Sequence, residues 1–204
     1  MRIILVLFLS GIFFTAYSQS DSTDIYMSET DTLTTYQEPV SFDSSVFYTD
    51  TIIRWMTFEE AEKAQQMNPR KVFVNIYATW CRWCRVEDSL GFKNREIAHY
   101  INQHYYPVKF NAETRTPVTF KGIPYFFEKD ETVFAHQLTS YLLNGKLSYP
   151  GAVFLDEKMN LMASKTGYLE PAYFESLLNY YADKAYKTMS FYDFDFEFIG
   201  KIKH

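Results

Sequence analysis

The sequence predicts an α/β fold with a central sheet that helices cover on both faces. Its clearest strand, Lys71–Tyr77, is apolar nearly throughout, which is typical of a strand buried on both sides. The only two cysteines of the chain, Cys81 and Cys84, follow this strand and open a helical segment. Further strands come later, and a long final helix begins at Pro171. This order of elements favours a sheet between layers of helices.

The first fifty residues differ in composition from the rest. Arg2, the apolar stretch Ile3–Phe14 and small residues before Gln19 predict a signal peptide over residues 1–18. The stretch is shorter than the about 20 apolar residues that span a membrane. Residues 19–50 are rich in Ser, Thr, Asp and Glu, which indicates a flexible acidic leader. We therefore expect an exported protein, periplasmic or secreted, with no stable membrane span after signal cleavage.

A folded domain is expected over residues 51–190. Thr57 and Glu60 form a capping-box pattern, and Asn68-Pro69 ends the helix that they open. The other elements expected in the first half are the strand Lys71–Tyr77, a helix from Cys81 to near Gly91, a helix capped by Asn94 and the strand Tyr106–Asn111.

The second half begins with an expected hairpin around Lys121-Gly122. The elements expected after it are a helix carrying Val133, Leu138, Leu142 and Leu143, the strand Ala152–Leu155, its hairpin partner Leu161–Ser164, and a helix from Pro171 to about Ala185. Aromatic and acidic residues alternate from Phe191 to Phe198, which favours an edge strand or a docked extension. Residues 191–204 are therefore treated as a C-terminal extension.

A Cys-x-x-Cys pair at a strand-to-helix junction is the sequence form of a redox-active dithiol. The helix N-terminus and the nearby Arg82 and Arg85 favour the thiolate of Cys81. We expect Cys81 to be exposed and Cys84 to lie one turn inside. A purely structural disulfide is disfavoured, because the loop between the cysteines is too short to add much stability.

Three other kinds of site remain open from the residues alone. Two thiolates can contribute to a zinc or copper(I) site, but no second pair of ligands is visible, and the four histidines show no ligand spacing. A cysteine hydrolase would need a partnered histidine and would leave Cys84 without a role. The third alternative is a client-binding module without redox turnover. The net charge of −5 argues against a nucleic-acid partner.

Two motifs carry a resemblance to a known family. Trp80-Cys81-Arg82-Trp83-Cys84-Arg85-Val86 and Ser148-Tyr149-Pro150-Gly151-Ala152-Val153-Phe154-Leu155-Asp156 resemble exported thioredoxin-family proteins with a Trp-Cys-x-Trp-Cys-Lys motif and a Tyr-Pro-Thr-x-x-Phe-Leu-Asp strand. The resemblance covers roughly residues 54–185. It implies a thioredoxin-like three-layer fold, a central mixed sheet flanked by helices, with an insertion at about residues 114–147 before the cis-proline strand.

The resemblance also implies roles for individual residues. Cys81 matches the attacking cysteine and Cys84 the resolving cysteine, while Pro150 matches the cis-proline that faces the disulfide. Tyr149 matches the residue whose backbone pairs with a bound substrate, and Trp80 the tryptophan beside the attacking cysteine. We expect at least one of Trp80 and Trp83 to be a partly exposed contact surface.

The sequence departs from thioredoxin at two places. Arg82-Trp83 replaces Gly-Pro between the cysteines, and Asn75 stands where thioredoxin has a buried aspartate. Asparagine cannot act as a base, so proton transfer during resolution would fall to water, to Lys109, which matches a lysine under the thioredoxin site, or to Glu87. Glu87 itself is expected to be a surface charge, usable only if its side chain turns inward.

These inferences predict a thiol–disulfide oxidoreductase that exchanges protein disulfides through a mixed disulfide on Cys81. Its partners would be protein thiols or disulfides and a redox partner that the sequence does not identify. We expect a monomer that needs no metal and no organic cofactor.

Overall fold

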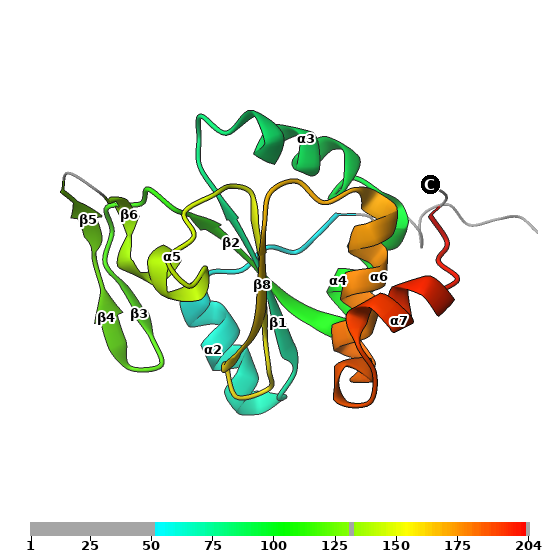
Figure 1. Ribbon diagram of the computed structural model, residues 1–204. Helices are drawn as coiled ribbons and strands as arrows, with labels where there is room; N and C mark the ends of the chain where they lie inside the picture. The colour runs from blue at the N-terminus through cyan, green and yellow to red at the C-terminus, as the bar shows by residue number, and fades with distance from the viewer. Residues whose placement is uncertain (1–51, 131–132, 203–204) are drawn as a thin grey trace, which may run out of the picture. The chain divides into compact units, whose positions relative to one another are not determined.

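The computed structural model describes residues 52–130 and 133–202, so the expected signal peptide and leader lie outside the described residues. A four-stranded sheet has the strand order β2-β1-β7-β8 (Figure 1). Strand β1 runs parallel to β2, whereas β7 is antiparallel to β1 and to β8. The strands are β1 (Lys71–Tyr77), β2 (Tyr105–Asn111), β7 (Gly151–Leu155) and β8 (Leu161–Thr166). The sheet is therefore mixed, as predicted.

Side chains of β1 alternate between two apolar clusters, one on each face of the sheet. Val72, Val74 and Ile76 pack with α2 (Phe58–Met67) and α5 (Gln137–Leu142). Phe73 packs on the opposite face with residues of α4 (Arg95–His104) and α6 (Pro171–Ala182). Figure 1 shows these helix pairs on opposite sides of the sheet. The fold thus has three layers, with a core on each face of the sheet.

The predicted helix starts in the first half are confirmed. Thr57 and Glu60 make both hydrogen bonds of a capping box, and the Asn94 side chain accepts backbone N–H bonds at the start of α4. Helix α3 (Arg82–Leu90) begins directly after Cys81 and has its C-cap at Gly91. This helix lies across the end of the sheet at which β1 finishes (Figure 1).

Two hairpins and α5 occupy the residues expected to be an insertion. The hairpin strands are β3 (Val118–Phe120) with β4 (Ile123–Tyr125), and β5 (Phe127–Lys129) with β6 (Phe134–His136). The helix predicted to carry Val133 is wrong in its first half. Residues 134–136 instead pair with β5, and the His136 imidazole caps the shorter helix by accepting the Leu138 N–H.

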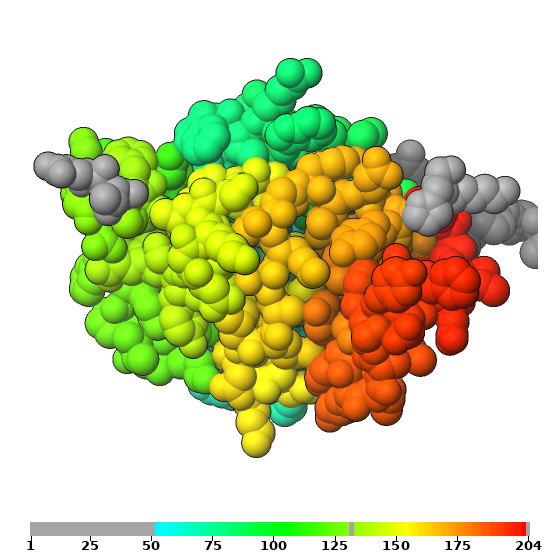
Figure 2. All heavy atoms as spheres, viewed as in Figure 1, coloured from blue at the N-terminus to red at the C-terminus, as the bar shows by residue number. Residues whose placement is uncertain are grey.

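The C-terminal tail is a helix, α7 (Phe191–Glu197), so the alternative of an edge strand is wrong and that of a docked extension is confirmed. Ser190 caps it, and Phe191 and Phe194 lie one turn apart against α6. Their rings lie 5.3 Å from that of Tyr180, and Figure 2 shows the tail against the surface of α6. Aromatic residues three positions apart thus lie on one face of a helix, although the alternation of aromatic and acidic residues is also typical of a strand.

The strand order of the mixed sheet and the helices that cover both of its faces make this a thioredoxin fold, which confirms the predicted fold class. The boundaries given to the domain, insertion and extension stay predictions. None of the helices within the described ranges has the length and apolar character needed to cross a membrane.

Candidate active site

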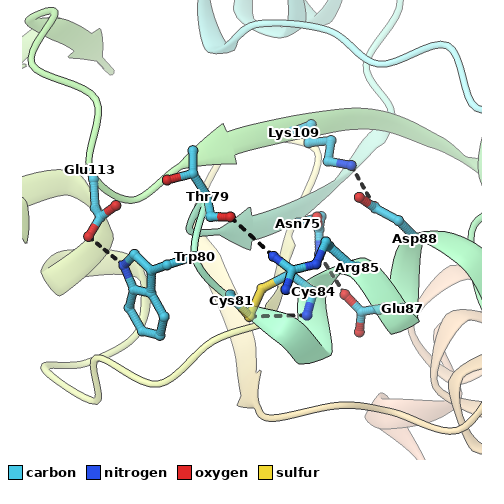
Figure 3. The surroundings of a disulfide bond; sticks show 10 residues. All are labelled: Asn75, Thr79, Trp80, Cys81, Cys84, Arg85, Glu87, Asp88, Lys109 and Glu113. Atoms are coloured by element: carbon cyan, nitrogen blue, oxygen red, sulfur yellow. Dashed lines mark hydrogen bonds and ion pairs between the residues drawn. A yellow bond between two sulfur atoms is a disulfide. The ribbon is translucent and has the colours of Figure 1, made fainter.

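The two cysteines form a disulfide at the junction of β1 and α3, with their Cα atoms 5.3 Å apart. Cys81 is the N-cap of α3, and its Sγ accepts the backbone N–H of Cys84 at 3.0 Å. An N–H aimed at this sulfur stabilises negative charge on it once the disulfide opens. Figure 3 shows the pair at the end of the helix.

Both cysteines are nearly inaccessible in the disulfide form, with 3% of Cys81 and 5% of Cys84 exposed. The expectation that Cys81 is exposed is therefore wrong for this form. Its cover comes from Ala78 and from the partly buried rings of Tyr77 and Tyr149. These side chains therefore limit access to the Cys81 sulfur in the disulfide form.

Two exposed tryptophans stand beside the covered disulfide. Trp80 is 65% exposed, packs edge-on against Tyr149, and donates its indole N–H to a Glu113 carboxylate oxygen at 2.7 Å. Trp83 is 57% exposed and stacks on Tyr168, with ring centroids 5.4 Å apart. The predicted exposure is thus confirmed for both tryptophans, and their role as a contact surface stays a prediction.

Glu113 and Tyr168 were missed by the sequence reasoning. Glu113 follows β2, and the parallel strands β1 and β2 end at the same edge of the sheet. That topology places side chains after β2 close to the cysteines after β1, so Glu113 had a usable signal. Tyr168 lies in the connection from β8 to α6, and no motif in the sequence marks it.

Pro150 is buried immediately before β7, and its peptide bond with Tyr149 is cis. Tyr149 packs against the cysteine cluster. Burial, together with a smaller effect of the negative charge of Glu113, raises the pKa of the Tyr149 phenol to about 12. This phenol stays neutral in the physiological range, so it offers an uncharged cover to the disulfide.

Arg82 and Arg85 lie exposed in the first turn of α3. One Arg85 guanidinium nitrogen donates to the Thr79 carbonyl at 3.4 Å (Figure 3). Both arginines add positive charge beside Cys81, which favours its thiolate in the reduced form.

The expectation that Glu87 is a surface charge is wrong, because only 3% of this residue is exposed. Glu87 lies one turn beyond Cys84 on the buried face of α3. The side-chain amide of Asn75, also buried, donates to the Glu87 carboxylate at 2.8 Å. An acid and an amide thus occupy the space under the disulfide, with the acid on the helix and the amide on the strand.

Burial, together with a smaller effect of the negative charge of Asp88, raises the pKa of Glu87 to about 8. The hydrogen bond from Asn75, a backbone hydrogen bond with Leu169 and the positive charge of Lys109 act in the opposite direction. Glu87 therefore changes protonation close to neutral pH, which is the range that a general acid or base needs.

Lys109 neighbours Asn75 across the β1–β2 pair, yet its ammonium bonds to neither Asn75 nor Glu87. It pairs with the Asp88 carboxylate at 2.5 Å (Figure 3). The rings of Trp55, Tyr77 and Phe92 lie within 5.3–5.8 Å of the same nitrogen. Of the three residues considered for proton transfer, the structure thus joins Asn75 to Glu87, whereas the Lys109 ammonium is bonded to Asp88.

No group of three or more His, Cys, Asp or Glu side chains that could hold a metal ion occurs in the part of the chain that the structure describes. The family described as Thioredox_DsbH, protein of unknown function, DUF255, matches residues 45–174. The chain belongs to the Thioredox_DsbH family. Its disulfide, its fold and this membership together support thiol–disulfide chemistry at Cys81 and Cys84.

Similar proteins include spermatogenesis-associated protein 20 of Rattus norvegicus, 30% identical over 60 residues. That match covers 29% of this chain and 8% of the relative, so the chain spans less than a tenth of that protein's length. Among solved structures, "DsbH Oxidoreductase" is 15% identical with a TM-score of 0.48 and covers 75% of this chain and 96% of that chain.

A thioredoxin from Thermus thermophilus is 17% identical with a TM-score of 0.48 and covers 65% of this chain and 88% of that chain. A putative disulphide-isomerase from Bacteroides thetaiotaomicron is 22% identical with a TM-score of 0.44 and covers 64% and 93%. The fold assignment rests on the strand order and family membership of this chain, and these distant likenesses add no detail of function.

Proposed function

We propose that this protein is a thiol–disulfide oxidoreductase of the cell envelope that exchanges protein disulfides through Cys81 and Cys84. The observation that carries the proposal is the Cys81–Cys84 disulfide at the N-terminus of α3, with the Cys84 N–H aimed at the Cys81 sulfur. Such a pair opens to a thiolate and a thiol without rearranging the fold. The chemistry needs no organic cofactor and no metal.

The exchange proceeds in two balanced steps. The Cys81 thiolate attacks a client disulfide, forms a mixed disulfide and releases one client sulfur as a thiolate. Cys84 then loses its proton and attacks the Cys81 sulfur, which expels the second client thiolate. The client disulfide is reduced by two electrons and the Cys81–Cys84 pair is oxidised. The reverse sequence oxidises a client dithiol.

Glu87 serves this exchange as the proton acceptor for Cys84. Both residues lie on the buried face of α3, one turn apart. The carboxylate form of Glu87 takes the Cys84 proton during resolution, and the acid form returns it when Cys84 leaves as a thiolate. A pKa of about 8 makes both forms available near neutral pH. Asn75, which cannot accept this proton, holds the carboxylate by its amide.

The cellular setting follows from the N-terminal sequence. A signal peptide over residues 1–18 would export the chain, periplasmic or secreted, where protein thiols and disulfides are its clients and a second redox protein recycles it. We propose that the protein works as a monomer, since one chain carries both cysteines and their supporting residues.

The proposal is tested with Cys81→Ser and Cys84→Ser in a disulfide-reduction assay on insulin. Each variant should lower turnover at least about a hundredfold, because each removes one of the two exchange steps. Only Cys84→Ser should accumulate mixed disulfides, since Cys81 still attacks but nothing resolves it. Ser89→Ala, on the exposed side of α3, is the matched control and should keep full turnover. Full activity in either cysteine variant would refute the proposal.

A client-binding module without redox turnover is the second candidate, and the two exposed tryptophans favour it. In that case, replacing both cysteines by serine leaves client affinity unchanged, while Trp80→Ala or Trp83→Ala lowers it. For the oxidoreductase, covalent client capture disappears with Cys81. Metal analysis of the purified protein tests the remaining alternative, a thiolate metal site.

A further inference from the structure

We propose that Asp88 is a positioning residue for the redox site: it holds the Lys109 ammonium away from Glu87, so that Glu87 keeps its acid form available near neutral pH and can both take and return the Cys84 proton, instead of staying ionised in an ion pair. This inference rests on the proposed function and names a residue that neither the resemblance nor the motifs single out.

The location of the cation is the first support. Lys109 is the strand neighbour of Asn75, and Asn75 is hydrogen-bonded to Glu87. Lys109 is therefore the cross-strand neighbour of the residue that binds Glu87. Its positive charge acts on the Glu87 carboxylate. A buried carboxylate next to an unbound ammonium would form an ion pair and lose its proton at lower pH.

The environment of the ammonium is the second support. Asp88 accepts a hydrogen bond from it at 2.5 Å, and the ring centroids of Trp55, Tyr77 and Phe92 lie 5.4, 5.3 and 5.8 Å from the nitrogen. Aromatic faces attract a cation but take no proton and carry no charge. The ammonium thus has a binding site other than Glu87. It is built from Tyr77 of β1, Asp88 of α3, Phe92 after α3 and Trp55 before α2.

The direction of the two neighbouring acids is the third support. Consecutive helix residues point about 100° apart, so Glu87 points into the core while Asp88 points to the edge, where its side chain is 41% exposed. A solvent-accessible carboxylate keeps its charge at little cost and can bind the lysine permanently. The buried carboxylate is left with a neutral amide as its partner.

The charged and titratable groups that lie near Glu87 in the described part of the chain fit this assignment. Asp88 on α3 opposes ionisation of Glu87, and Lys109 on β2 favours it. Tyr168, from the connection between β8 and α6, is neutral at physiological pH because its own pKa is raised by burial and by the charges of Glu170 and Glu87. Asn75 on β1 and the backbone at Leu169 are uncharged. Burial has the largest effect on the protonation of Glu87, and Asp88 and Lys109 are the two charged neighbours that act on it in opposite directions.

The test is a titration of the Glu87 carboxyl by carbon-13 NMR in the full-length oxidised protein, where the cysteines do not titrate. Glu87→Gln identifies the signal. Asp88→Asn should lower the titration midpoint by about one pH unit, because it removes an anion and releases Lys109. Lys109→Met should raise the midpoint, because it removes a cation and leaves Asp88. Asp88→Glu and Lys109→Arg keep the charges and should restore the wild-type midpoint.

The rate at which Cys84 resolves a Cys81–glutathione mixed disulfide gives a second readout. At pH 7, resolution should be about fivefold faster in Asp88→Asn and slower in Lys109→Met, since the ionised fraction of Glu87 changes in those directions. A purely structural role would shift neither midpoint, or would shift both in the same direction, and would overturn the inference. The proposed proton route fails separately, if Glu87→Gln resolves the mixed disulfide with the wild-type rate and pH profile.

Discussion

Two glutamates are buried in the described part of the protein, and their surroundings differ in kind. Glu175 on α6 accepts the backbone N–H of Lys201 at 3.0 Å on one oxygen and that of Ile202 at 2.9 Å on the other. Glu87 receives a side-chain amide from Asn75, has an anion beside it in Asp88, and has its pKa raised to about 8.

The difference separates a carboxylate that docks the chain from one that can carry a proton. A donor on each oxygen satisfies the charged form of Glu175 and fixes the backbone of the tail against α6. The Glu87 site instead tolerates the neutral form, because desolvation outweighs the few donors that it provides. The same residue type thus holds the tail at one end of the fold and, in the proposed mechanism, carries a proton at the other.

The largest expected effect that tests this comparison is on stability against pH. The folded pKa of Glu87 is raised from 4.5 to about 8, so the folded state favours the acid form. Its contribution is fully present below about pH 4.5 and is lost as the pH rises to 8, at about 1.4 kcal/mol per pH unit and roughly 4 kcal/mol in all. Glu87→Gln should be more stable than wild type at pH 8 and should lack this slope.

The measurement is urea unfolding of the oxidised protein at pH 5, 6.5 and 8, compared between wild type and Glu87→Gln at each pH. The comparison cancels the contribution of His104 and His136, whose pKa values are lowered by burial and whose effect on stability has the opposite sign. Glu175→Gln, measured at the same three pH values, is the matched control for replacing a buried glutamate by glutamine. Equal slopes in wild type and Glu87→Gln would abolish the distinction between the two glutamates.

An effect of intermediate size on the unfolding free energy is expected where the C-terminal tail contacts Glu175. A Cβ added to Gly200 would lie 2.5 Å from a Glu175 carboxylate oxygen and 3.0 Å from the Phe198 ring. Gly200→Ala should therefore push the tail from its carboxylate and cost about 1–2 kcal/mol of unfolding free energy. Hydrogen exchange of the amides of residues 191–202 should accelerate, while the rate of mixed-disulfide resolution stays at the wild-type value.

Ile199→Ala is the control for that change, because Ile199 is almost fully exposed. It should alter neither stability nor exchange. If Gly200→Ala slowed redox turnover while Ile199→Ala did not, the tail would belong to the active site, and the two regions would not be independent.

The sequence was a good guide wherever a local signal fixes the structure. Thr57 and Asn94 predicted helix starts by their capping chemistry, and the position of Cys81 after an apolar strand predicted the redox site. Glu87 was misjudged because its burial depends on which face of α3 meets the sheet. Val86 and Leu90 mark an apolar side of that helix in sequence, yet Leu90 is exposed and the acid is buried.

Long-range pairing explains the other differences. Residues 134–136 form a strand because their backbone pairs with β5. The local sequence of that segment does not predict this pairing. The Asp88–Lys109 pair joins residues of α3 and β2 that only the fold brings together. Tyr168 reaches Trp83 in the same way. Side chains that meet across elements are thus the part of the site that sequence reasoning misses.

The smallest expected effect concerns a third carboxylate, Glu113, which accepts the Trp80 indole N–H at the surface. A surface hydrogen bond to a carboxylate contributes at most about 1 kcal/mol, so Glu113→Ala should change the unfolding free energy by less than about 1 kcal/mol. The Trp80 indole N–H should exchange faster with solvent and shift in proton NMR. Glu113→Gln keeps an acceptor oxygen and should leave that signal near its wild-type position.

Glu113 bonds to the Trp80 indole at the surface and has no part in the proposed proton transfer by Glu87. The pH midpoint of the Glu87 titration should therefore be the same in Glu113→Ala and in wild type. A shift of that midpoint, accompanied by a matching change in mixed-disulfide resolution, would show that the charge of Glu113 reaches the proton site. Glu87 and Glu113 would then form one electrostatically coupled group near the disulfide, connected through Trp80. Glu175, which binds the tail, would remain separate from that group.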